Sequence, residues 1–177
     1  MKNINYLQIK LLLPLIIFIL YGYHFISNTT IDTNVKCGKK SEIINGWIKL
    51  NISQNILIKK LGIPEFKGED EYWGATGLYV QEWIYRKKGL SFLMASEKKG
   101  GLKKACGITV EEPCQYKTSC NIGIKSSYKD VMLKYKNIID KENTCDSIIV
   151  VGSVYYGTYF YFKNLLVYQI IIGSMAE

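Results

Sequence analysis

One order of elements, a short helical stretch followed by three strand-like runs, occurs twice in this sequence and limits the folds open to the chain. In the first unit the helical stretch covers residues 54–61 and is stopped by Gly62 and Pro64. Apolar and polar residues alternate in the strand-like runs, which is typical of strands buried on one face. These runs lie at 79–86, 90–95 and 104–110.

The second unit begins with a helix whose start is marked by a cap. Ser127 followed by Asp130 predicts a capping box of the acidic kind. Apolar residues at the spacing of one helix face follow: Tyr128, Val131, Met132 and Tyr135. Strand-like runs come next, at 148–151, 154–162 and 165–172.

The two units align when Ser53 is placed on Ser127, and Leu57 then meets Val131. One such unit cannot bury both faces of a three-stranded sheet, whereas two units can share one sheet. We therefore expect an α+β fold over residues 46–177. It is a tandem α-β-β-β repeat whose antiparallel sheet has the helices packed on one face, preceded by an N-terminal hydrophobic helix.

The N-terminal segment has the order of an export signal. Lys2 and Lys10 provide a basic start, and an unbroken apolar run, 11–20, follows. Residues 1–27 are either a cleaved signal sequence or an uncleaved signal anchor. The anchor is favoured because Tyr23 and Phe25 crowd the cleavage positions. Residues 7–26 are then long enough to enter the membrane as a transmembrane helix, and 28–45 form a polar linker.

This segment predicts a location in the bacterial cell envelope. With an uncleaved anchor, the domain is held at the inner membrane and faces the periplasm. With a cleaved signal, the protein is periplasmic or secreted. Either way the partner is expected to be another envelope protein.

Charge and composition argue against nucleic acid as that partner. The net charge is +8, but Arg86 is the only arginine, and the lysines are scattered in ones and twos. Proteins that bind nucleic acids use arginine for bidentate contacts to bases and phosphates. We therefore expect no nucleic-acid binding.

The five cysteines indicate disulfides and not a metal centre. Four lie in the expected domain, and Cys114 and Cys120 are close enough in sequence to form one bridge across a loop. No C-x-x-C pair is present, and the only histidine, His24, lies in the apolar segment. We expect neither a metal nor a small-molecule cofactor.

No catalytic constellation is found either. Ser-His and Cys-His mechanisms need a histidine base, and none exists outside the apolar segment. The acidic runs 69–71 and 111–112 lie in apparent loops beside lysines, where exposed carboxylates are the default. We expect a protein that is not an enzyme.

Aromatic content is the feature most suggestive of binding, with 14 tyrosines and three tryptophans. If one face of the sheet is open, aromatic residues there form a surface suited to protein contact. The alternative is that they belong to the core. The candidate protein-binding residues share a parity within their runs: Tyr79, Trp83 and Tyr85, and then Tyr155, Tyr159 and Tyr161.

The repeated order, together with an Ile-Gly-x-x-Ser-Ser-Tyr-x-x-Val helix start at 122–131, resembles the beta-lactamase-inhibitory-protein-like fold. The unit is also similar to that of the SmpA/OmlA envelope proteins. The resemblance covers about 46–175 and implies an envelope or secreted protein that binds other proteins without catalysis. SmpA/OmlA proteins carry a lipid-modified cysteine, and no lipobox precedes Cys37.

Two functions follow as hypotheses. The first is an exported, membrane-anchored or secreted protein-binding module that uses an open sheet face. The second is a structural or accessory envelope protein, of the outer-membrane assembly type, whose aromatic face is covered within the chain.

Overall fold

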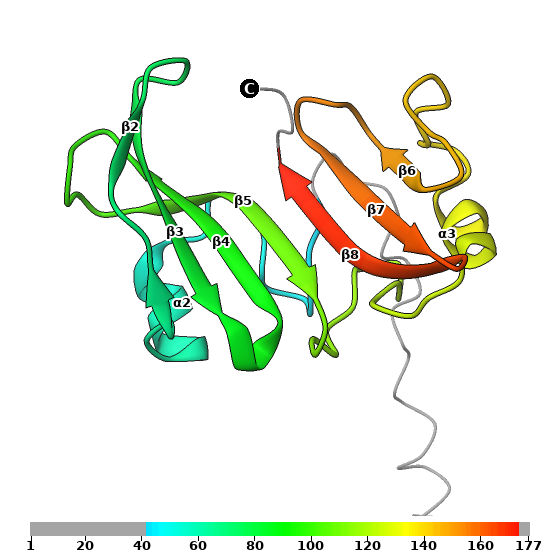
Figure 1. The fold of residues 1–177 in the computed structure, drawn as a ribbon, viewed down its shortest axis with the longest axis horizontal. Coiled ribbons are helices and arrows are strands. Elements are labelled where there is room, and N and C mark those ends of the chain that lie inside the picture. The colour runs from blue at the N-terminus through cyan, green and yellow to red at the C-terminus, as the bar shows by residue number, and fades with distance from the viewer. Residues whose placement is uncertain (1–41, 174–177) are drawn as a thin grey trace, which may run out of the picture. The chain divides into compact units, whose positions relative to one another are not determined.

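Eight antiparallel strands dominate the structure, a computed structural model that describes residues 42–173 (Figure 1). The strands are β1 Phe66–Lys67, β2 Glu71–Trp73, β3 Leu78–Tyr85, β4 Leu90–Ser96, β5 Lys104–Glu111, β6 Ile148–Val151, β7 Gly157–Lys163 and β8 Leu166–Gly173. The α-helices of the described part are α2 Gln54–Leu61 and α3 Tyr128–Tyr135, and a 3₁₀ turn, η1 Arg86–Lys88, joins β3 to β4.

The expected α+β class, with helices packed on one face of the sheet, is wrong: the fold is mainly β. Each helix is only 8 residues long and buries two side chains, Leu57 and Leu61 in α2 and Val131 and Tyr135 in α3. The strands therefore supply most of the core. The N-terminal hydrophobic helix was expected in residues that lie outside the described part.

The strands form one sheet in the order β1-β3-β4-β5-β8-β7-β6, with β2 also paired to β3. Each half contains a meander of three strands, β3 to β5 and β6 to β8. The two meanders join through β5 and β8, between Gly107–Glu111 and Gln169–Gly173. The centre of the sheet is thus a long-range pairing of two locally folded units.

The two helix starts make the same backbone contacts with the sheet. Asn51 N–H donates to Ala105 O at 2.8 Å, and Lys125 N–H donates to Val167 O at 2.7 Å. Both donors have positive φ, 62° for Asn51 and 70° for Lys125. The sequence alignment that places Ser53 on Ser127 also places Asn51 on Lys125. The predicted capping box at Ser127 is confirmed, whereas Ser53 makes no side-chain cap bond.

One face of the sheet forms the core. Two rows of cross-strand partners run across it, and every member is buried. On α3, Tyr135 lies with its ring 5.1 Å from that of Phe160 and Tyr128 with its ring 4.9 Å from that of Phe162. The rows are Trp83, Phe92, Ile108, Ile172, Thr158 and Val151, and Tyr85, Leu90, Val110, Ile170, Phe160 and Ile149.

Described residues at the end of the range expected as a linker, 28–45, belong to the packed fold. Ile44 is completely buried, and Glu42 is 4% exposed. The Glu42 carboxylate accepts hydrogen bonds from Ser119 N–H at 2.9 Å and from the Ser119 hydroxyl, and the Tyr135 hydroxyl lies 3.0 Å from Oε2. Burial and the nearby Glu42 carboxylate raise the pKa of Tyr135. This buried network ties the start of the domain to α3.

Two further expectations need correction. None of the helices in the described range 42–173 is long and apolar enough to cross a membrane, so the predicted transmembrane helix and signal anchor are not found there. The segment on which they were placed, 7–26, lies outside the described residues. The predicted bridge between Cys114 and Cys120 is absent, because Cys114 carries a free thiol. No disulfide joins two residues of the described part.

Candidate protein-binding face

Part of the second face of the sheet is half-buried, whereas Val80, Ala95, Val150 and Tyr159 on the same side are buried. Antiparallel sheets commonly pack one face on the core and leave the other solvated, with polar side chains on the solvated side. Here the side chains directed away from the core include few charges and several large apolar groups. We call the following half-buried set the open face: Ile84, Ser91, Leu93, Thr109, Ile148, Tyr161, Gln169 and Ile171.

The open face is continuous across the strands. Ile84 pairs with Ser91, Ser91 with Thr109, and Thr109 with Ile171. Directly paired residues of antiparallel strands lie about 5 Å apart and contact one another on the same face. Because this row runs from β3 to β8, it bridges the two meanders at the centre of the sheet.

The structure separates the six aromatic residues that the sequence grouped. Trp83 and Tyr85 point into the core and are 2% and 1% exposed. Tyr79 shares their side of β3 near its start, is half-buried, and lies with its ring 5.3 Å from that of Tyr72. These three residues therefore do not belong to the open face.

The three aromatic residues of the second group occupy different places. Tyr155 is exposed, but it lies in the turn before β7, which begins at Gly157 and not at 154. Tyr159 has the orientation of the open face yet is buried, and its hydroxyl donates to Val154 O at 2.5 Å. Tyr161 lies on the open face with its ring 6.2 Å from that of Tyr168. Of the six residues, only Tyr161 lies on the half-buried part of the open face.

Sequence reasoning missed most of the open face because it searched for aromatic residues. Ile84, Leu93 and Ile171 are aliphatic, and each lies between buried core residues along its strand. The alternation in β3 and β4 contains this pattern. Tyr168 was not predictable from alternation, because a register shift between Tyr161 and Phe162 breaks the period there.

Carboxylates occupy the margin of the open face although the chain is basic overall. Glu82 pairs with Leu93, and Glu111 pairs with Gln169, so both carboxylates point to the open side, and both are exposed. Neither forms an ion pair with another described residue. Lysines occur on this side only at strand ends, at Lys104 and Lys163.

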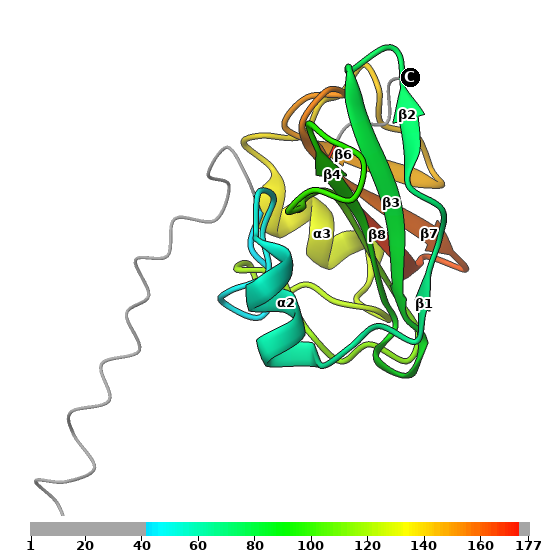
Figure 2. The same cartoon turned by 90° about the vertical axis from the view of Figure 1, so that its left-hand side faces the viewer.

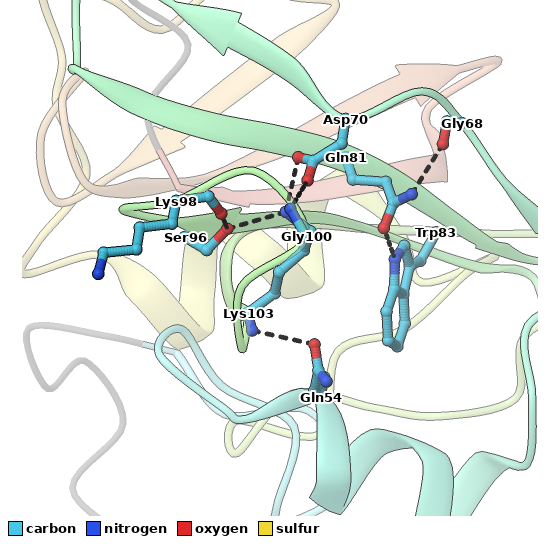
Figure 3. A network of polar contacts seen from close by, with 9 residues as sticks. All are labelled: Gln54, Gly68, Asp70, Gln81, Trp83, Ser96, Lys98, Gly100 and Lys103. Atoms are coloured by element: carbon cyan, nitrogen blue, oxygen red, sulfur yellow. Dashed lines mark hydrogen bonds and ion pairs between the residues drawn. The ribbon is translucent and has the colours of Figure 1, made fainter.

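The densest polar cluster lies elsewhere, around a buried lysine (Figure 3). The Lys103 ammonium, in a residue only 4% exposed, donates to Asp70 Oδ1 at 2.6 Å and to Ser96 Oγ at 2.9 Å. Asp70 Oδ2 also accepts from Gly100 N–H at 2.6 Å, and Lys103 N–H donates to Gln54 Oε1 at 2.9 Å. The cluster thus joins α2, β4 and the segments before β2 and β5.

The electrostatics of this cluster are those of a structural ion pair. Burial opposes ionisation of Asp70, but the hydrogen bonds from Lys103 and Gly100 outweigh it and lower the pKa of that carboxyl. Every buried polar side-chain atom in the described part has a hydrogen-bond partner. Next to this cluster, Trp83 Nε1–H donates to Gln81 Oε1, and Gln81 Nε2–H donates to Gly68 O. These two hydrogen bonds hold the tryptophan side chain in its place in the core. We assign this cluster to stability.

The remaining chemistry-bearing groups do not assemble into a site. Within 42–173 no group of three or more His, Cys, Asp or Glu side chains lies close enough to hold a metal ion. Cys114 is buried, and its burial raises the pKa of its thiol. Cys106 and Cys145 are exposed and free. The open face is therefore the strongest candidate for function.

Comparison with known proteins adds no relative: no protein-family model, curated protein sequence or solved structure matches the chain.

Proposed function

We propose that this protein is an exported, non-enzymatic module of the bacterial cell envelope that binds a partner protein through the open face. The observation that carries the proposal is the half-buried row from Ile84 through Ser91 and Thr109 to Ile171, with Leu93 beside it, on the side of the sheet opposite the core. Apolar surface that remains in water is a cost unless a partner covers it.

The composition of the face supports a protein as the partner. Interfaces combine an apolar centre with a polar rim. The open face has this arrangement, with Leu93 and Ile171 near the centre and Glu82 and Glu111 at the margin. The basic, apolar N-terminal sequence agrees with export.

A single charge placed on the open face tests the proposal. Thr109 is half-buried and pairs with Ser91 on one side and Ile171 on the other. In Thr109→Arg the large charged side chain would be taken out of water beneath the partner and would disrupt the fit, which we expect to weaken capture about tenfold or more. The measurement is affinity capture from cells crosslinked intact, with the captured protein quantified by mass spectrometry.

Leu133→Arg is the matched control, because Leu133 is an apolar residue on α3 that is 63% exposed and outside the open face. We expect it to capture the same partner as the parent chain. Equal capture by all three proteins, with folding verified by circular dichroism, would rule out the open face and favour a structural role.

A further inference from the structure

A groove opens where β5 and β8 separate. The two strands pair only as far as Glu111 and Gln169. The first residues of β8 instead bond to the segment before α3, with Val167 N–H donating to Ser126 O at 2.9 Å. The space left beside the end of β5 measures about 800 Å³, which is within the range of ligand-binding clefts. We call it the β5–β8 groove.

The groove has an apolar lining. Phe162 and Val167 are buried beside it, while Leu166 and Tyr168 are 44% and 47% exposed. Tyr168 occupies the position of the register shift in β8, so its ring points to the side of the open face. An apolar side chain placed here would remove part of the Leu166 and Tyr168 surface from water.

Four charged residues surround this lining, and two of them are already paired. Glu112 Oε1 and Lys125 Nζ lie 2.7 Å apart, and both side chains are largely exposed. Glu111 and Lys163 form no ion pair with any described residue. The groove therefore offers one carboxylate and one ammonium for an incoming ligand.

The separation of these two charges suits an extended peptide. Glu111 ends β5 and Lys163 ends β7, with β8 between them, and Lys163 lies two residues beyond Tyr161, which shares the row of Glu111. The two residues are separated by two strand spacings across the sheet and by two residues along the strands, so their backbones lie roughly 12 Å apart. An extended chain covers that span in about four residues. Its alternate side chains then point to the same side.

We propose that the β5–β8 groove binds an extended peptide segment of the partner protein with the pattern basic-x-apolar-x-acidic, in either chain direction. The basic side chain meets Glu111, the apolar side chain lies against Tyr168 and Leu166, and the acidic side chain meets Lys163. This inference rests on the proposed function, because Glu111 and Tyr168 border the open face.

A phage library of random dodecapeptides, selected on the full-length protein in mild detergent, tests the groove. We expect the enriched peptides to share the basic-x-apolar-x-acidic pattern. Measured by fluorescence polarisation, Glu111→Lys should weaken binding of the most enriched peptide about tenfold, through lost attraction and added repulsion. Glu142→Lys makes the same charge change on an exposed loop residue, and it should leave binding within about twofold.

Glu111→Lys also provides a gain of binding, which loss of folding cannot produce. It should bind the same peptide with its basic residue replaced by glutamate, in either chain direction, because the groove then offers two ammonium groups, and the parent protein should bind that peptide more weakly. Absence of the pattern among enriched peptides, or equal binding by the parent and Glu111→Lys, would overturn the groove. If Glu111→Lys still binds the enriched peptides and Thr109→Arg does not, the peptides bind elsewhere on the open face, and only the proposal of the groove is wrong. If no partner protein is crosslinked at the open face, but peptide binding is still weakened by Glu111→Lys, only the proposed function is wrong.

Discussion

Lys103 shows at the scale of a residue how this small core accommodates charge. Lysines are almost never fully buried unless paired, and no sequence pattern distinguished Lys103 from its neighbour Lys104. In the structure Lys104 is exposed, whereas the Lys103 ammonium is held by Asp70 and Ser96. The acidic run 69–71, expected as a solvated loop, supplies that counter-charge.

Removing one member of this pair should be costly. Asp70→Ala leaves the Lys103 ammonium buried without its carboxylate, and we expect it to lower the free energy of unfolding by about 3 kcal/mol. Lys125→Ala breaks the exposed pair with Glu112 and should cost less than about 1 kcal/mol. Urea unfolding of both variants measures the difference. Similar losses for the two would mean that the Lys103 pair contributes no more than a surface ion pair.

Trp83 marks the limit of sequence reasoning at this scale. Strand β3 alternates large apolar residues on both sides, with Trp83 and Tyr85 on one and Ile84 on the other. Periodicity separates the two sides but does not tell which one faces the core, since both are apolar. The aromatic side turned out to be the buried one, and the open face is largely aliphatic.

At the scale of elements, local chemistry determined how much was predictable. Both helix ranges follow from short-range spacing, and the capping box at Ser127 depends on residues only three apart. Strands β1 and β2 were missed because two or three residues are too few to show a period. The start of β7 was placed too early because 154–156 are apolar and aromatic yet form part of a turn.

The turn between β3 and β4 depends on Gly89. Its φ is 60°, and a Cβ there would lie 2.1 Å from Glu111 O and 2.6 Å from Cys114 N, both backbone atoms. Gly100 has a similar φ of 71° but nothing within 4 Å of its Cβ position. Gly100→Ala should therefore cost about 1 kcal/mol from backbone strain alone, and Gly89→Ala about 3 kcal/mol or more because packing is also disrupted.

Thermal unfolding of the two glycine variants, followed by circular dichroism, measures this contrast. An equal decrease in melting temperature would mean that the close approach of η1 to the end of β5 does not constrain the sheet.

For the whole molecule, the central feature is the difference between the two sides of the sheet. Local patterns predicted a helix followed by strands in each half, but the pairing of β5 with β8 joins residues more than 50 positions apart, and no local pattern encodes it. That pairing creates the continuous row from Ile84 to Ile171, and its early end at Glu111 creates the groove. Figure 2 shows the two short helices, α2 and α3, beside the long strands that make up most of the fold.

The most direct test of the account places a photoreactive benzoylphenylalanine at Thr109 in the full-length protein in living cells. Because the interface would bring a partner within van der Waals reach of this position, illumination should yield one discrete crosslinked species, which the same residue at Leu133 does not give. No product at Thr109, or the same products at both positions, would contradict an open face that binds a partner protein.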